Sequence, residues 1–327
     1  MRRAAPFILL ICWLAALAAP LASADGDVEP EPSATDPRFE VIEDPILAKL
    51  KALDEIAPFE DLAPLWDHRD PKLQAAIDRS FEDLGLADGI RSEHLAFVLI
   101  DITKIEAPRV AEVNGDVMMY AASLPKIAVL LAAFEQIAQG KMKLDDETQR
   151  LLEQMIRHSS NAATTEMMHR VGKENIAHVL LSPRYRLYDP RRNGGLWVGK
   201  DYAKAGLWRR DPLHNLSHGA TAMQVARFYY LLETGNLVTP EHSAMMKEIL
   251  SDTALEHKFV KVLRRINPAA LLFRKSGTWR TFHADSVLVR RGDRAYIAVA
   301  LSNDRQGQRW LSEVIEAADR IIFSEAS

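Results

Sequence analysis

The chain has 327 residues, of which 48% are hydrophobic and 26% are charged, enough apolar material for one large domain with a sizeable core. This composition excludes a wholly disordered chain. The formal net charge of −4 argues against nucleic acid as the main partner. The single cysteine is Cys12, so the rest of the chain must be held together by its core rather than by disulfides.

The first 24 residues have the pattern of a secretory signal. Two arginines precede an apolar run at 7–19, and Ala-Ser-Ala at 22–24 forms a small-residue cleavage site. We expect cleavage after Ala24, a periplasmic or secreted protein, and no stable membrane anchor after signal removal. Loss of the two arginines leaves 39 basic and 45 acidic residues, a net charge of −6.

Residues 25–70 are interpreted as a linker and an N-terminal extension. The stretch at 25–37 is acidic and rich in proline, which is typical of an exposed linker. The stretch at 38–70 alternates short apolar clusters with proline and charge, and we expect it to pack on the main domain. The main domain then comprises residues 71–327.

The first regular elements of this domain are a helix and two strands. A helix is predicted at 71–84 because Leu73, Ile77, Phe81 and Leu84 share one face. Strands are predicted at 95–102 and 108–113, and the second of them runs into an Asn-Gly turn. We expect these two strands to pair.

The middle of the chain is helical. Helices are predicted at 123–139, 145–157, 162–170, 221–232 and 240–250. Between the third and the fourth lies an irregular stretch at 181–218, and its embedded aromatic residues favour an ordered loop. Part of it, 184–211, has eight basic residues against three aspartates, and such an excess either attracts an anionic substrate or cell-wall polymer or is simply solvated. The basic residues are Arg184, Arg186, Arg191, Arg192, Lys200, Lys204, Arg209 and Arg210.

The last third returns to strands. We predict strands at 271–279, 286–290 and 295–301, and a closing helix at 308–323. This order indicates an α/β (α+β) fold in which one antiparallel sheet of about five strands is built from both ends of the chain. The α/β part comprises 71–118 and 265–327, and 119–264 is an inserted helical part.

The first part of the helix predicted at 123–139 is apolar. From its start to Phe134, the only polar side chains are Ser123 and Lys126. Their spacing places both on one face, where the amine can reach the hydroxyl. Pro125 is compatible with a first helical turn. A desolvated lysine can lose its proton and act as general base for a serine nucleophile. The simpler alternative is a capping serine and a lysine that extends to solvent.

Two further motifs follow in order: Ser159-Ser160-Asn161 at a corner between helices, and Lys275-Ser276-Gly277-Thr278 on a strand. Together with Ser123-Leu-Pro-Lys126 they resemble the penicillin-recognising serine hydrolases, which include class A β-lactamases and D,D-peptidases. The resemblance covers residues 72–323. It implies the β-lactamase/transpeptidase-like fold.

The resemblance also implies a role for each motif. Ser123 would form an acyl-enzyme with a cyclic or peptide amide, and Lys126 would take or relay the hydroxyl proton. Ser159, helped by Lys275, would protonate the departing nitrogen. Asn161 would hold the amide side chain of the substrate, and Ser276 and Gly277 would line the approach. The N–H groups of Ser123 and Thr278 would form the oxyanion hole. The residue-level alternatives are helix caps for the corner and a solvated strand end.

One departure from the family pattern concerns deacylation. Class A β-lactamases carry a glutamate on the loop after the helical corner, whereas this chain has no glutamate between Glu174 and Glu233. Glu166 lies too close to Ser159 along the chain to replace it. Asp189, Asp201 or Tyr202 could hold the water instead. In addition, Ser160 stands where aspartate is commonest.

We therefore expect a class A β-lactamase-type serine hydrolase acting on a small-molecule β-lactam or a cell-wall peptide. The alternatives are a D,D-peptidase or amidase, and a β-lactam or peptidoglycan binding protein that scarcely turns over. His214 and His218 are spaced i, i+4 but have no third ligand, so we expect neither a metal nor another cofactor. We expect a monomer.

Overall fold

The computed structural model describes residues 64–324, so the predicted signal and all of 25–63 lie outside the described residues. The described residues belong to one compact unit. Among them, no helix combines the length and the apolar run that crossing a bilayer needs. The helices are η1 (Leu65–His68), α2 (Pro71–Asp83), α3 (Ala87–Arg91), α4 (Lys126–Ala138), α5 (Asp146–Arg157), α6 (Asn161–Val171), α7 (Lys173–Leu180), η2 (Pro190–Arg192), α8 (Ala222–Glu233), α9 (Pro240–Leu250), α10 (Lys258–Ile266) and α11 (Gly307–Ser324).

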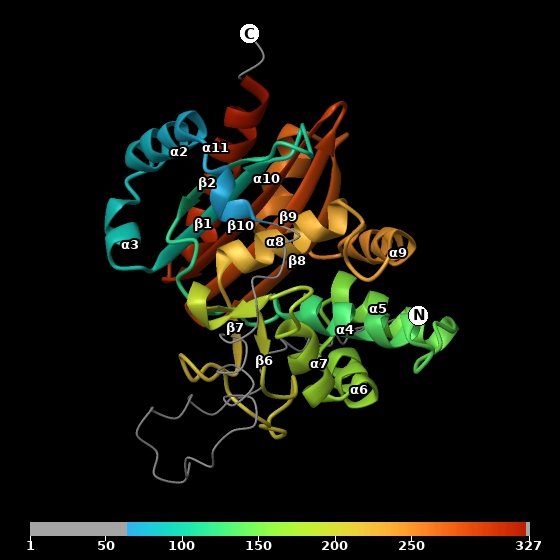
Figure 1. Ribbon diagram of the computed structural model, residues 1–327. Coiled ribbons are helices and arrows are strands. Elements are labelled where there is room, and N and C mark those ends of the chain that lie inside the picture. Colours follow the sequence, from blue (N-terminus) through green and yellow to red (C-terminus); the bar gives the residue numbers. More distant parts are fainter. Residues whose placement is uncertain (1–63, 325–327) are drawn as a thin grey trace, which may run out of the picture. The chain divides into compact units, whose positions relative to one another are not determined.

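The main sheet has five antiparallel strands in the order β2-β1-β10-β9-β8 (Figure 1). β1 pairs with β2, and both ends of the chain build the sheet, as the sequence predicts. Leu95 lies opposite Ser302, so the first strand of the domain also pairs with the last. Short strands form two small sheets elsewhere, β3-β7-β6 and β4-β5. The strands are β1 (Leu95–Asp101), β2 (Arg109–Val113), β3 (Met119–Tyr120), β4 (Tyr188–Asp189), β5 (Gly194–Gly195), β6 (Trp197–Val198), β7 (His218–Ala220), β8 (Leu271–Trp279), β9 (Phe282–Arg291) and β10 (Arg294–Asn303).

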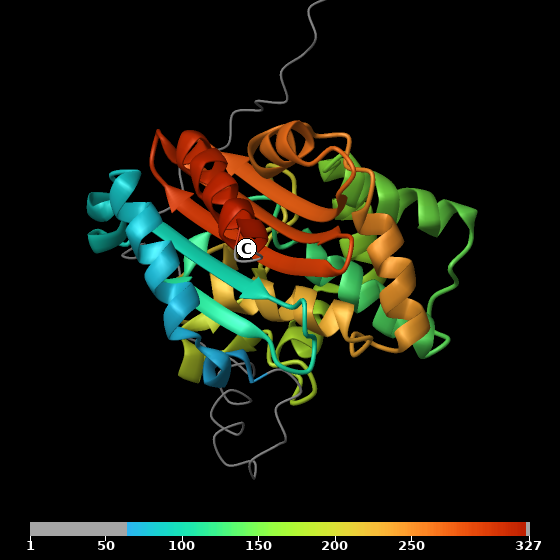
Figure 2. The ribbon, with the colours of Figure 1, turned by 90° about the horizontal axis from the view of Figure 1, so that it is seen from above.

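Helices cover both faces of the main sheet. Along β1, Phe97 and Leu99 join one apolar cluster, whereas Val98 and Ile100 join the other, because successive side chains point to opposite faces. The first cluster includes residues of α2, α10 and α11, and the second includes residues of α8. Figures 1 and 2 show α2 and α11 on one face and α8 on the other. A strand buried on both faces is apolar throughout, as β1 is.

The helical part is arranged around α4. Residues 126–134 of this helix are all buried, and α5, α6, α7 and α9 pack against it. A helix that is apolar all round must lie inside the protein. Lys126 is therefore held at the buried start of the central helix.

Several elements differ from the sequence predictions. The helices α3, α7 and α10 were not predicted, and they have only five to nine residues.

The stretch at 181–218 is ordered, as its aromatic residues predict, with Tyr185, Tyr188 and Trp197 buried. The end of the N-terminal extension also packs on the domain, because Leu65 and Trp66 are buried in the core.

Candidate active site

Ser123 lies in a tight turn that leads into α4. Ala122, the residue before it, has a left-handed φ of 48°. The N–H groups of Leu124 and Lys126 donate to carbonyls three residues earlier rather than four. The prediction that the helix begins at Ser123 is therefore wrong, because this turn replaces its first residues. The turn leaves the Ser123 side chain half-buried at the end of the helix.

The Lys126 amine is buried and points to the helical corner. It donates to the Ser159 carbonyl at 2.6 Å and to Asn161 Oδ1 at 2.8 Å, and it lies 3.4 Å from Ser159 Oγ. Within the described residues, no hydrogen bond joins it to the Ser123 hydroxyl. Burial lowers the pKa of Lys126 to about 7. A neutral amine is thus accessible near neutral pH.

Ser159 connects this amine to the strand motif. Its hydroxyl accepts a hydrogen bond from Lys275 Nζ at 2.9 Å, on the buried part of β8. Burial, together with the charge of Lys126, holds the pKa of Lys275 well below its usual range. Two ammonium groups around one hydroxyl repel each other, so the neutral form of one of them is favoured. A hydroxyl that accepts from both lysines keeps its own proton for a third partner.

The helical corner is held by a different serine. Ser160 caps α6 by accepting from the Ala163 N–H at 3.2 Å. Ser159 has a left-handed φ of 55°, and Asn161 is the exposed first residue of α6. Because Ser160 supplies the cap, the side chains of Ser159 and Asn161 are available to accept hydrogen bonds from Lys126 and Lys275. Strained backbone of this kind is common at functional sites.

Gly277 brings β8 against the turn that carries Ser123. A Cβ at this position would lie 2.2 Å from the Ala121 carbonyl oxygen and 2.8 Å from the Ser123 nitrogen, so only glycine allows the approach. Ser276 is buried beside it, whereas Thr278 is exposed. The three sequence motifs thus lie together: Lys126 and Lys275 meet at the Ser159 hydroxyl, and Gly277 lies against the backbone of Ser123.

Lys258 is a site neighbour that the sequence analysis missed. Its buried ammonium group donates to the Gly277 carbonyl and to Thr278 Oγ1, both at 2.7 Å. Burial lowers the pKa of Lys258 to about 8. Behind it, Arg274 forms two hydrogen bonds of 2.7 and 2.8 Å with the buried Asp285. An amphipathic pattern over residues 258–266 could have revealed α10, but not where Lys258 points.

Tyr202 lies beside Lys126. The amine is 4.6 Å from the centre of the Tyr202 ring, and the phenol donates to the Ala122 carbonyl at 3.1 Å. The ring also stacks on buried His218 at 4.2 Å. Burial raises the pKa of Tyr202 well above its usual range and lowers that of His218 to about 3. Both rings are therefore neutral at physiological pH.

The other acidic candidates for water activation are engaged elsewhere. Asp189 pairs with Arg191 at 2.9 Å, and Asp201 pairs with Lys173 at 2.8 Å. Glu166 is exposed and pairs with Arg170. Of the three residues that the sequence left open, only Tyr202 contacts Lys126. No cluster of three or more histidines, cysteines, aspartates and glutamates that could hold a metal occurs in residues 64–324.

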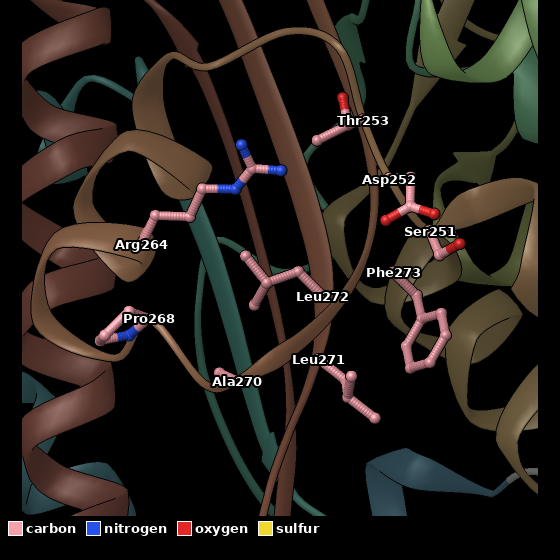
Figure 3. A pocket seen from close by; sticks show the side chains of 9 residues that line it. All are labelled: Ser251, Asp252, Thr253, Arg264, Pro268, Ala270, Leu271, Leu272 and Phe273. Atoms are coloured by element: carbon pink, nitrogen blue, oxygen red, sulfur yellow. The ribbon is translucent and has the colours of Figure 1, made fainter.

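A separate cavity of about 380 Å³ opens at the start of β8. Figure 3 shows Arg264 on one side of it and Ser251 and Asp252 on the other, with Leu272 between them. Its lining contains none of the predicted site residues. The chemistry of the three motifs does not extend into it.

Comparison with solved structures identifies the same architecture. A β-lactamase from Sphaerobacter thermophilus DSM 20745 is 15% identical with a TM-score of 0.59, and the match covers 77% of this chain and 97% of that chain. A β-lactamase from Chitinophaga pinensis DSM 2588 is 15% identical with a TM-score of 0.61, covering 77% and 100%. A PBP-A variant, solved as an acyl-enzyme complex with penicillin G, is 16% identical with a TM-score of 0.60, covering 79% and 98%. At these identities the likeness concerns the fold.

A comparison with curated proteins finds no match. The sequence model of the Beta-lactamase enzyme family, in contrast, matches residues 90–150 and 147–325. These two segments hold all three motifs and most of the described elements. The chain belongs to the beta-lactamase enzyme family.

Proposed function

We propose that the protein is a serine hydrolase that opens a β-lactam or a related amide through an acyl-enzyme on Ser123. The observation that carries this proposal is the Ser159 hydroxyl held between the buried amines of Lys126 and Lys275, next to the turn that bears Ser123. Family membership supports a hydrolase of the serine β-lactamase type. The signal-like N-terminus supports a periplasmic or secreted location.

In the proposed acylation, the Ser123 oxygen attacks the amide carbonyl and its proton passes to neutral Lys126. The N–H groups of Ser123 and Thr278 stabilise the charge that develops on the carbonyl oxygen. As the carbon–nitrogen bond breaks, Ser159 donates its proton to the nitrogen. Ser159 then regains a proton from Lys126 across their 3.4 Å contact. The net result is transfer of one proton from Ser123 to the leaving nitrogen.

In the proposed deacylation, water must lose a proton without the help of a carboxylate. In the part of the chain that the structure describes, no carboxylate hydrogen-bonds to Lys126, Ser159 or Lys275, and Tyr202 stays protonated. Lys126, which is neutral once Ser159 has regained its proton, must therefore act as the base a second time. We infer that the acyl-enzyme is long-lived and that β-lactam turnover is slow.

A second candidate function follows from the same arrangement. A site that acylates readily but hydrolyses slowly fits a D,D-peptidase or amidase on peptidoglycan peptides, in which an amine can replace water as acceptor. It also fits a protein that captures β-lactams or peptidoglycan. The Tyr202 phenol beside Lys126, in place of a carboxylate, favours these alternatives.

The test mixes the protein with a chromogenic cephalosporin and follows colour and intact mass together. We expect a stoichiometric mass adduct and slow colour formation, both lost in Ser123→Ala. Fast steady colour would support an efficient β-lactamase and contradict slow deacylation. The absence of both colour and adduct would exclude β-lactams as substrates.

A further inference from the structure

Lys258 is a buried cation beside the site to which the proposed acylation gives no role. It is the first residue of α10 and is 1% exposed. Its Nζ donates to the Gly277 carbonyl and to Thr278 Oγ1 at 2.7 Å each, and to the Ala284 carbonyl at 3.1 Å. These three acceptors use all three N–H groups of the ammonium. Lys258 therefore acts on the ends of β8 and β9 rather than as a direct contact for a substrate.

The stability of the fold does not explain this lysine. Among the residues that the structure describes, no carboxylate hydrogen-bonds to its ammonium group. The carboxylate of Asp285 instead accepts from Arg274 and from the Phe259 N–H. Lys258 also has a left-handed φ of 48°, which is uncommon for a residue with a side chain. A buried charge without a carboxylate partner, carried on strained backbone, is unfavourable for folding and is typical of a functional position.

The peptide unit that Lys258 holds also carries the proposed oxyanion donor. The Gly277 carbonyl and the Thr278 N–H belong to one trans peptide, so they point in opposite directions. β8 is an edge strand, and β9 lies on the side from which Lys258 binds the carbonyl. The Thr278 N–H therefore points to the other edge of β8. The backbone of Ser123 is close to this peptide, since a Cβ at Gly277 would lie 2.8 Å from the Ser123 nitrogen.

We propose that Lys258 is a positioning residue for the oxyanion hole. By donating to the Gly277 carbonyl, it fixes the plane of this peptide and makes the Thr278 N–H a stronger donor, because hydrogen bonds in a chain polarise one another. Both the ammonium and the neutral amine can donate to the carbonyl. The N–H gains most from the negative oxygen of the tetrahedral state, so the acylation step is accelerated rather than substrate binding. This inference rests on the proposed acyl-enzyme on Ser123 and deepens it.

The test compares Lys258→Met with the parent in acylation by a β-lactam, followed by intact mass under single-turnover conditions. We expect the limiting acylation rate to fall by about tenfold or more, because the oxyanion donor is weakened. The dissociation constant of the initial complex should stay within about twofold of the parent, because that complex holds a neutral carbonyl. The matched control is Lys261→Met, which removes the same charge from an exposed position of α10 and should acylate at the parent rate.

The infrared band of the acyl carbonyl is a readout that a purely structural role would not move. With a β-lactam isotope-labelled at the reacting carbonyl, Lys258→Met should shift this band to higher frequency, since weaker hydrogen bonding at the oxygen strengthens the carbon–oxygen bond. Lys261→Met should leave the band in place. Only acylated molecules give the band, so unfolded protein does not affect it. Lys258→Gln, whose side chain ends one atom short of the lysine nitrogen, is measured in parallel, so that the comparison does not depend on the folding of one variant.

The outcomes separate this inference from the proposed function. If the parent and the Lys258 variants form the adduct at equal rates and with one band frequency, the inference is overturned and the proposed function stands. Slower acylation with an unshifted band also overturns it, because Lys258 would then have a structural role alone. If no β-lactam forms an adduct with the parent, the proposed function fails, and this inference fails with it.

Discussion

Ser159 is the residue on which the site depends, because its hydroxyl is shared by two buried lysines. Neither Lys126 nor Lys275 hydrogen-bonds to a carboxylate among the described residues, and for both amines burial is the largest effect on the pKa and lowers it. The consequence is an amine that is available as a base at neutral pH. A lysine in water, with a pKa near 10.4, would almost never be neutral there.

The acylation rate should therefore depend on the protonation of Lys126. We expect the rate of adduct formation on Ser123 to rise with pH, with a midpoint of about 7, and then to level off, because only the neutral amine accepts the proton. Stopped-flow or quenched mass measurements between pH 5.5 and 9 would check this. A rate that is independent of pH over this range contradicts the assignment of Lys126 as base.

The two adjacent serines offer a sharp comparison. Ser159→Ala should slow acylation by about 100-fold or more, because the leaving nitrogen loses its proton donor. Ser160→Ala should acylate at the parent rate, because Ser160 only caps α6. Loss of this cap should lower the free energy of unfolding by about 1 kcal/mol. Adduct kinetics and urea unfolding of both variants separate the two roles. Equal acylation rates in the two variants would remove Ser159 from the mechanism.

At the scale of elements, sequence periodicity predicts the long helices and strands well. The starts of α2 and α9 are marked by capping residues and proline. The predicted strand at 271–279 has the same bounds as β8. The helices α7 and α10 escaped prediction because they are short and depend on packing for their stability. The left-handed turn at Ala122, which moves the start of α4, depends on contacts with β8 and β7 that no local pattern reveals.

The three motifs could be proposed from the sequence, since each is short and stands at an element end. The positions of Lys258 and Tyr202 could not. The Tyr202 phenol reaches the Ala122 carbonyl across 80 residues of chain, and Lys258 reaches β8 from an unpredicted helix. Such contacts follow from the way whole elements pack.

The loop that carries Tyr202 should control the pKa of Lys126. Tyr202→Ala removes both a ring that favours the charged amine and a cover that excludes water. Burial is the larger effect on this lysine, so the pKa should rise, and with it the midpoint of acylation, by about one pH unit. Tyr202→Phe keeps the ring and should keep the midpoint. The pH profiles of both variants check this, and a lower midpoint in Tyr202→Ala would show that the cation–π contact dominates.

At the scale of the whole molecule, one buried ion pair connects β8, β9 and the segment before α10. Arg274 on β8 and Asp285 on β9 are both almost fully buried, and Arg274 also donates to the Leu255 carbonyl in the segment that precedes α10. Breaking a buried pair leaves an uncompensated charge, which is more unfavourable than losing the pair itself.

Asp285→Asn should therefore lower the free energy of unfolding by about 3 to 5 kcal/mol. The control is Glu316→Gln, which breaks the exposed pair with Arg265 and should change it by less than about 1 kcal/mol. Denaturant unfolding of both variants gives the comparison. A small effect in Asp285→Asn would mean that the remaining hydrogen bonds of Arg274 suffice.

The pairing of Leu95 with Ser302 also has a kinetic consequence. β1 cannot pair with β10, the central strand of the sheet, until the last third of the domain has been made, and closing so long a loop is slow. Because Gly277 on β8 lies against the Ser123 turn, we expect this turn to be completed only after β8 has joined the sheet. If Ser123 reacts as proposed, the rate at which refolding protein becomes able to react with a fluorescent β-lactam therefore measures the last step of folding.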